Sequence, residues 1–125
     1  MSILYRVLDE NNRLQIRSSS ISQSTQIIVS CLKQHDFGIL ELNTLNTFSE
    51  KYKHIISNGD YKLYLFANSM FTKRDAYNRI LLDSRFVQKL DLGIERKVAI
   101  FPRENSLLVL NWKFAEKYAA LIHGK

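Results

Sequence analysis

The sequence has a single cysteine and only four glycines among its 125 residues. One cysteine excludes a disulfide framework and the cysteine-rich zinc sites, and it is typical of a reducing compartment. The glycines are dispersed, whereas dinucleotide-binding and phosphate-binding loops need them clustered, because only glycine lets the backbone close around a phosphate. No run approaches the about 18 consecutive apolar residues of a spanning helix, and no signal peptide is evident. We therefore expect a cytoplasmic protein with no cofactor and no membrane partner.

Histidine is almost as scarce, and its placement favours no chemistry. His35, His54 and His123 each lie near the end of a predicted helix, where a partial positive charge meets the carbonyl-rich pole. None of the paired spacings typical of metal sites, such as His-x-His or His-x-x-x-His, occurs. We therefore predict no metal site and no catalytic residue.

What the sequence does contain is a globular composition with an uneven charge. Its 46% hydrophobic and 24% charged residues indicate one soluble domain over residues 1–125. The formal charge is +6, and residues 1–60 are neutral, so the whole excess belongs to residues 61–125. A surface biased in this way attracts polyanions, whether acidic protein or nucleic acid.

Apolar spacing and turn residues predict the order ββαβαβαββα. The predicted elements are a hairpin of strands at 3–8 and 13–17, a helix at 21–36, a strand at 39–42, a helix ending at Asn58-Gly59, a central strand at 61–67, a helix at 72–91 that Asp83-Ser84 could divide, a hairpin of strands at 97–101 and 107–110, and a last helix capped by Asn111.

Helices that join parallel strands cross over right-handedly and pack on the faces of the sheet. We therefore expect a single compact α/β domain in which about four helices cover a mixed sheet of about six strands. In its element order this arrangement resembles the STAS domains, a class of protein-binding modules. The chain has no matching phospho-acceptor motif, so the resemblance assigns no functional residue.

The predicted helix at 72–91 carries the strongest binding signal. At 100° per residue, one of its faces is basic and the opposite face is apolar. The predicted partner-binding residues are Lys73, Arg74, Asn78, Arg85, Lys89 and, from the second hairpin, Arg103. The alternative interpretation of this stripe is an ordinary solvated helix face.

A second candidate site follows from the expected topology, because open α/β sheets bind ligands beyond the carboxyl ends of parallel strands. The residues predicted there are Asn43, Thr44, Asn68, Ser69 and Thr72. Their alternative role is to cap the helices that follow.

These observations favour a small non-catalytic protein-binding module, resembling an immunity protein, antitoxin or inhibitor, that docks an acidic protein on its basic half. A nucleic-acid-binding module that uses the same stripe on RNA or DNA is the first alternative. A small metal-independent ribonuclease is the second, with His54 beside Lys51, Tyr52 and Lys53 as one polar cluster and Tyr77 with Arg79 as another. An exposed edge strand would also allow a homodimer.

Overall fold

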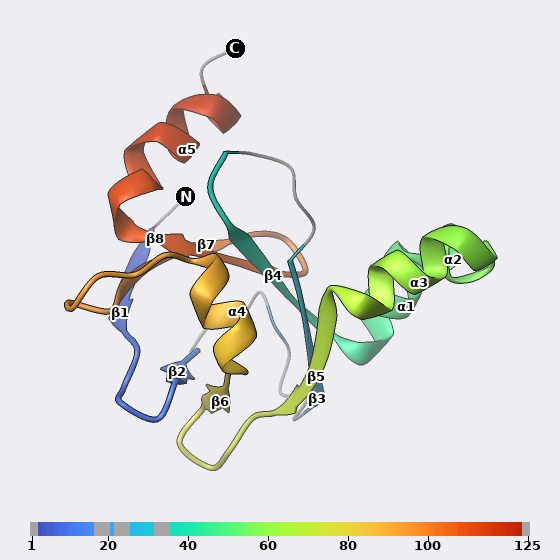
Figure 1. Ribbon diagram of the computed structural model, residues 1–125, viewed down its shortest axis with the longest axis horizontal. Coiled ribbons are helices and arrows are strands. Elements are labelled where there is room, and N and C mark those ends of the chain that lie inside the picture. Colours follow the sequence, from blue (N-terminus) through green and yellow to red (C-terminus); the bar gives the residue numbers. More distant parts are fainter. Residues whose placement is uncertain (1–2, 17–20, 22–25, 32–35, 124–125) are drawn as a thin grey trace.

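The computed structural model describes residues 3–16, 21, 26–31 and 36–123, and Figure 1 shows their arrangement. The strands are β1 (Leu4–Val7), β2 (Arg13–Gln15), β3 (Gln26–Ser30), β4 (Ile39–Thr44), β5 (Ser69–Lys73), β6 (Arg79–Leu81), β7 (Lys97–Pro102) and β8 (Leu107–Asn111). The helices are α1 (Leu45–Lys51), α2 (Lys53–Ile56), α3 (Gly59–Ala67), α4 (Ser84–Lys89), the 3-10 helix η1 (Trp112–Phe114) and α5 (Ala115–His123).

Six strands form one sheet in the order β1-β7-β8-β4-β3-β5, and β2 pairs with β6 in a separate two-stranded ribbon. The prediction of one α/β domain with about six strands and helices on the sheet is confirmed. In the described part of the chain every strand pairing is antiparallel. The parallel crossovers expected from the element order do not occur, because consecutive strands such as β3 and β4 pair directly with each other. The likeness to STAS domains in element order is lost with them.

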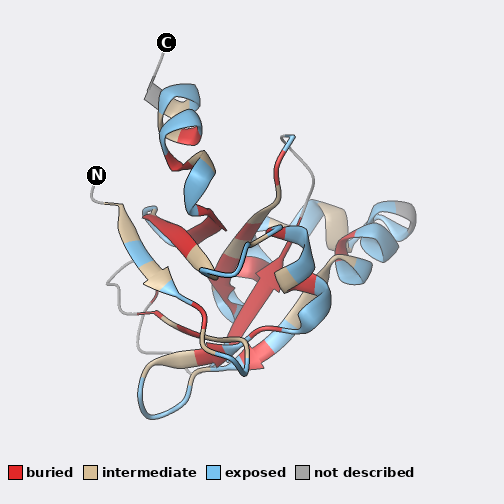
Figure 2. Ribbon diagram, turned by 60° about the vertical axis from the view of Figure 1, so that its left-hand side comes forward, coloured by how far each residue is buried: buried red, intermediate tan, exposed pale blue. Residues whose placement is uncertain are grey.

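The two faces of the sheet carry separate clusters of buried side chains, since successive residues of a strand point to opposite faces. One face holds the larger cluster, in which Leu40 and Val109 pack under the β2–β6 ribbon and α4. The other face is covered by α5, which packs on Phe101, and by α1 and α3, which pack on Ile28. Figure 2 shows the buried residues concentrated in the sheet, while α1–α3 carry mostly exposed side chains.

The structure reveals an internal repeat that sequence analysis missed. The pattern Asp-x-x-Asn-Arg-apolar occurs at residues 9–14 and again at residues 75–80. Both copies form the same turn between two strands, β1 and β2 in one case and β5 and β6 in the other. In each turn the Asp N–H bonds to the Arg carbonyl and the Asn N–H bonds to the Asp carbonyl. The two halves of the chain therefore contain the same strand-turn-strand unit.

The repeat extends through the whole sheet. Exchanging β1 with β5, β3 with β7 and β4 with β8 leaves the strand order unchanged when it is read backwards. The pairing of Leu40 with Val109 has its counterpart in the pairing of Leu107 with Leu42. A pseudo-two-fold axis thus relates the halves, and Glu41, which pairs with Leu108 between these two pairs, lies at its centre.

Three predicted elements are correct in kind and place. The strand at 39–42 is β4, the hairpin at 97–110 is formed by β7 and β8, and Asn111 caps the chain's last helical segment. The strands β7 and β8 are mostly buried apolar runs, β4 buries Leu40 and Leu42, and each is bounded by a turn or a capping residue. The helix predicted before Gly59 is also present but is divided into α1 and α2 at Tyr52, and Thr44 is its N-cap.

The helix predicted at 21–36 is wrong where the structure describes this segment. Residues 26–30 form the strand β3, which pairs with β4 on one side and β5 on the other. The run Ile27-Ile28-Val29 is β-branched throughout and buried on both faces, which suits a strand inside a sheet. The pattern Ser20-Ile21-Ser22-Gln23, which has the form of a capping box and favoured a helix start here, lies mostly outside the described residues.

The central strand predicted at 61–67 is also wrong, because these residues form α3. Among the described side chains of α3, Leu65 alone is buried. The large side chains exposed along this helix are Tyr61, Leu63, Tyr64 and Phe66. Apart from Lys62 the run is apolar or aromatic and shows no clear periodicity, so its composition favoured a strand although the central place in the sheet belongs to other segments.

The long helix predicted at 72–91 is divided into β5, a turn, β6 and α4. The turn at Asp75 and Asn78 interrupts the helix, and Asn78 has the left-handed φ of 62°. The division foreseen at Asp83-Ser84 does occur, since the Asp83 side chain accepts the N–H of Arg85 and caps α4. The strands of the predicted leading hairpin exist as β1 and β2, but they pair with β7 and β6 rather than with each other.

Candidate functional site

The outer face of the β2–β6 ribbon is the candidate site, and its two turns are held by aspartate side chains. One oxygen of Asp9 accepts the N–H groups of Asn11 and Arg13 at 2.9 and 2.8 Å. In the same way one oxygen of Asp75 accepts those of Tyr77 and Arg79 at 2.8 and 2.9 Å. The N–H of Arg13 lowers the pKa of Asp9, and the N–H of Arg79 lowers the pKa of Asp75. Both carboxylates are therefore charged parts of the turn.

Each turn is also tied to the other half of the ribbon. Asn12 and Asn78 both have a φ of 62°, which turns their carbonyls toward the opposite strand. The carbonyl of Asn78 accepts the N–H of Ile16 at 2.7 Å, and the carbonyl of Asn12 accepts the N–H of Leu82 at 2.9 Å. These reciprocal bonds fix the two turns relative to each other about the pseudo-two-fold axis.

Alternation along the ribbon sends one set of residues inward and another outward. Leu14 and Ile80 pair at its centre and are fully buried in the core. The outward set comprises Arg13, Gln15, Arg79 and Leu81, which are partly or largely exposed. The site is therefore a two-stranded surface with two arginines placed by equivalent turns.

The side chain of Arg79 is held by contacts within its own turn. Its Nε donates to Asp75 at 2.9 Å, and its guanidinium lies 5.2 Å from the centre of the Tyr77 ring. The side-chain amide of Gln15 donates to the carbonyl of Tyr77 at 3.3 Å, which joins the outer face of β2 to the second turn. The Tyr77 side chain itself is 69% exposed, so the turn tip is open to a partner.

The predicted basic stripe is not one surface in the structure. Lys73 ends β5, Asn78 lies in the turn, and Arg74 between them is half-buried. Two guanidinium nitrogens of Arg74 are buried without a hydrogen-bond partner among the described residues, and burial lowers its pKa. Arg85 and Lys89 share one exposed face of α4. The acidic protein partner predicted for these residues stays a prediction.

Arg103 is separated from the rest of the stripe. It follows β7 and lines a groove on the face of the sheet that α1 and α5 flank, whereas α4 packs on the other face. The prediction groups Arg103 with the stripe because the predicted helix at 72–91 is expected to lie near the second hairpin. In the structure Arg103 and α4 lie on opposite faces of the sheet.

The predicted ligand loops are only partly brought together. Thr44 and Thr72 both pair with Ile27 of β3, so the ends of β4 and β5 do lie at one edge of the sheet. Ser69 instead pairs with Ser30 at the opposite end of β3, and Asn68 precedes it. Thr44 caps the start of α1, which is the alternative role considered above, whereas Asn68 is the C-cap of α3, the helix that precedes it.

The polar cluster proposed for a ribonuclease is also divided. His54 and Lys53 are exposed on α2, whereas the side chains of Lys51 and Tyr52 both bond to Glu41 of β4. Tyr77 and Arg79, the other pair considered, belong to the ribbon described above. The ribonuclease hypothesis stays a prediction.

Sequence reasoning missed Arg13 and Gln15, and the repeat could have found them. Two copies of Asp-x-x-Asn-Arg whose Asp residues are 66 positions apart would have placed Arg13 and Arg79 in equivalent positions. The described residues contain no group of three or more His, Cys, Asp or Glu side chains arranged to hold a metal ion. Within the same residues no helix is long and apolar enough to cross a membrane.

Comparisons with known proteins assign no class to this chain. No protein-family model matches the sequence, and no curated protein is similar to it at a significant level.

Proposed function

We propose that this chain is a DNA-binding module that seats the outer face of the β2–β6 ribbon in the major groove of duplex DNA. The observation that carries the proposal is the pair of equivalent turns that place Arg13 and Arg79 on one exposed ribbon. The major groove is about 12 Å wide and admits a two-stranded β-ribbon.

The outward side chains suit this partner. Arginine pairs with the edge of guanine through two hydrogen bonds, and glutamine pairs in the same way with adenine. Arg13, Arg79 and Gln15 are therefore side chains that can read bases. The formal charge of +6 adds an attraction for the phosphates that does not depend on sequence.

Symmetry is the second argument. A protein with two-fold symmetry presents the same groups to both strands of a duplex, and its target sites tend to be palindromic for that reason. Here the pseudo-two-fold axis passes between Leu14 and Ile80, so the ribbon offers one arginine to each half of a site. The carboxylates of Asp9 and Asp75 are charged and lie beside this surface, but each holds its own turn in place because it accepts that turn's N–H groups.

The test is fluorescence anisotropy with mixed-sequence duplex DNA at ~50 and ~200 mM salt, a range over which phosphate contacts cost orders of magnitude in affinity. Arg13→Ala and Arg79→Ala are each expected to weaken binding by roughly ten-fold or more. Lys62→Ala, which removes the same charge from the exposed face of α3, is the matched control and should change affinity little.

Duplex RNA of the same length separates groove recognition from general attraction. The A-form major groove is too deep and narrow for side chains to enter, so RNA should bind more weakly than DNA. The proposal is overturned if duplex DNA fails to bind at low salt, or if Lys62→Ala and Arg79→Ala weaken binding equally. Failure to bind DNA would leave an acidic protein as the partner to seek.

A further inference from the structure

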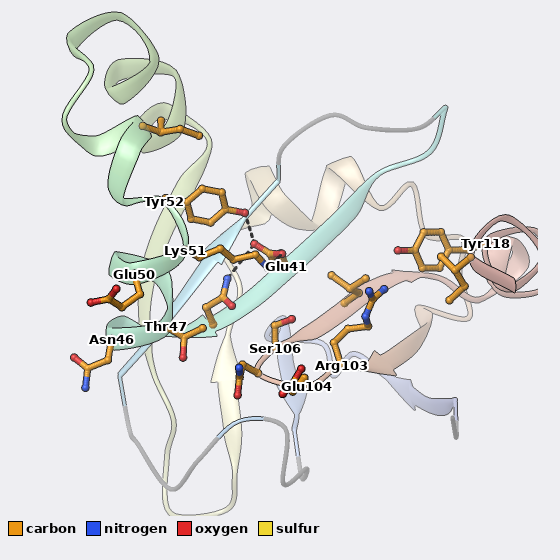
Figure 3. A pocket seen from close by; sticks show the side chains of 15 residues that line it. Glu41, Asn46, Thr47, Glu50, Lys51, Tyr52, Arg103, Glu104, Ser106 and Tyr118 are labelled. Atoms are coloured by element: carbon orange, nitrogen blue, oxygen red, sulfur yellow. Dashed lines mark hydrogen bonds and ion pairs between the residues drawn. The ribbon is translucent and has the colours of Figure 1, made fainter.

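A groove lies on the face of the sheet opposite the ribbon, between α1 and α2 on one side and α5 on the other. It has a volume of about 1230 Å³. Its floor includes Glu41 and Asn43 of β4 and Leu108 of β8, so it sits over the pseudo-two-fold axis where Glu41 pairs with Leu108. Figure 3 shows Glu41, Lys51 and Tyr52 joined at one wall and Tyr118 at the other end.

Glu41 is already engaged by three neighbouring side chains. One of its oxygens accepts Lys51 Nζ at 2.5 Å, and the other accepts the Tyr52 hydroxyl and, at 3.0 Å, the side-chain amide of Asn43. Burial raises the pKa of Glu41, but the hydrogen bonds from Lys51 and Tyr52 outweigh it and hold the pKa below its ordinary value. The carboxylate is thus ionised and its charge is balanced by Lys51.

This carboxylate determines which way Asn43 faces. An ionised carboxylate only accepts hydrogen bonds, so the NH₂ group of Asn43 must point to Glu41 and the carbonyl oxygen Oδ1 must point elsewhere. Asn43 is fully buried, and its Oδ1 has no hydrogen-bond partner among the residues that the structure describes. Buried polar oxygens without a partner are rare in folded proteins and call for a donor.

The other residues that line the groove indicate what kind of hydrogen-bond donor would fit. Ile55 of α2, Ile122 of α5 and Leu108 form apolar walls and floor. The rim carries the carboxylates of Glu50 and Glu104. Because Glu41 and Lys51 form an ion pair, Arg103 is the one cation that remains among the described lining residues. A groove with a buried, unpartnered acceptor, apolar walls and an excess of carboxylate among its described lining residues is complementary to a cation that has an apolar body.

We propose that the groove binds a primary organic ammonium, with its N–H donated to Asn43 Oδ1 and its apolar part between Ile55 and Ile122. The ammonium supplies the missing donor and the positive charge that the rim favours, while the apolar part covers Leu108. A free amine and a lysine side chain share this chemistry. The site is independent of the DNA-binding proposal, since it uses none of the ribbon residues.

The experiment is a titration of the full chain followed by two-dimensional ¹H–¹⁵N NMR, which observes the Asn43 side-chain NH₂ directly. Phenethylamine is the probe, with 2-phenylethanol as the neutral match and 3-phenylpropionate as the anionic one. We expect the amine to shift the Asn43 signals with a Kd of ~1 mM, typical for so small a ligand. The alcohol should bind roughly ten-fold more weakly, and the anion more weakly still. A capped lysine distinguishes a protein-borne ammonium from a free amine.

Two variants test the assignment of the site. Asn43→Ala should weaken phenethylamine at least about ten-fold, because it removes the acceptor. Since Asn43→Ala could also disturb β4, Ile122→Trp provides a second test: it fills the groove from α5, leaves the Glu41 network intact and should abolish binding. Equal binding of amine, alcohol and anion would overturn the proposal, as would binding that Ile122→Trp leaves unchanged or the absence of any shift at ~10 mM amine.

Discussion

Leu14 and Ile80 lie directly opposite each other at the centre of the β2–β6 ribbon, and neither side chain is exposed to solvent. They occupy equivalent positions in the two copies of the repeat, so the ribbon is fastened to the core at its pseudo-two-fold axis. The position of the outward face that carries Arg13 and Arg79 therefore depends on the packing of this buried pair.

Truncating either member of this pair should be costly. Leu14→Ala and Ile80→Ala are each expected to lower the free energy of unfolding by about 2–5 kcal/mol, because each leaves a cavity in the larger core. The double variant should lose less than the two single losses together, since the residues contact one another. Urea unfolding measures all three, and Leu81→Ala, an exposed position of the same ribbon, should cost less than about 0.5 kcal/mol. Strict additivity would show that the two side chains are not coupled.

The turn around Arg79 gives a prediction opposite to simple electrostatics. Asp75→Ala removes a negative charge beside the proposed DNA surface, and this alone should strengthen DNA binding. The substitution also removes the acceptor of two backbone N–H groups and the partner of Arg79 Nε, so the arginine is no longer held in place. We expect DNA affinity to fall by roughly three-fold or more, because positioning outweighs one screened surface charge.

Glu10→Ala is the matched control for that experiment, since it removes an exposed acid from the first turn while Asp9 continues to accept the N–H groups of that turn. It should leave DNA affinity unchanged or slightly higher. If both variants strengthen binding alike, Asp75 does not position Arg79.

The elements that could be predicted are those whose signal is local. β4, β7 and β8 are short apolar runs bounded by capping or turn residues, and Asn111 carries its own capping hydrogen bond to Lys113. Residues 27–29 and 63–67 are continuous apolar runs, which fit a buried strand and a helix equally well. Residues 26–30 form a strand because they pair with β4 and β5. Residues 61–67 have no place in the sheet and form the helix α3.

The candidate site could be predicted only through its repeat. Arg79 was considered because of its neighbour Tyr77, whereas Arg13 lies in a neutral half of the chain and has no charge signal of its own. What joins the two arginines is a register of β2 on β6 that no local pattern encodes. The groove was beyond sequence reasoning because its lining comes from β4, α1, α2, α5 and the loop after β7.

The helix caps at equivalent positions of the two halves should contribute measurably to stability. Thr44 accepts the N–H of Thr47 at the start of α1, and Asn111 accepts the N–H of Lys113 at the start of η1. Thr44→Ala should cost about 1 kcal/mol of unfolding free energy, and Thr44→Ser should restore most of it. Asn111→Ala should cost more, about 2 kcal/mol, because Asn111 also donates to the carbonyl of Asp91 at 2.9 Å. A larger loss for Thr44→Ala than for Asn111→Ala would contradict this order.

Gly38 is required by close packing. A Cβ at this position would lie 2.0 Å from the carbonyl oxygen of Lys89, so the loop before β4 touches the end of α4 backbone to backbone. Gly38→Ala should therefore lower the unfolding free energy by about 1–3 kcal/mol. Gly93→Ala is the control, because nothing lies within 4 Å of a Cβ there. Equal stability of the two variants in urea unfolding would mean that the loop moves aside without cost.

The network around Glu41 should make stability depend on pH at both ends of the scale. The pKa of Glu41 lies below its ordinary 4.5, so the unfolded chain takes up this proton first and the contribution, complete above about pH 4.5, is lost as pH falls. Burial, followed by the bond to Glu41, raises the pKa of Tyr52 above its ordinary 10.0, so its contribution is complete below pH 10 and is lost as pH rises further.

Glu41→Gln should lower the unfolding free energy at pH 7 by about 1–3 kcal/mol and flatten both limbs of the profile. Urea unfolding between about pH 3 and pH 11 measures this. Glu50→Gln, an exposed residue of the same groove, should retain both limbs. Asp9 and Asp75 also have lowered pKa values and contribute to the acid limb, so Glu41→Gln should make that limb shallower and not remove it. An acid limb as steep in Glu41→Gln as in the unsubstituted protein would place the responsible carboxylates elsewhere in the chain.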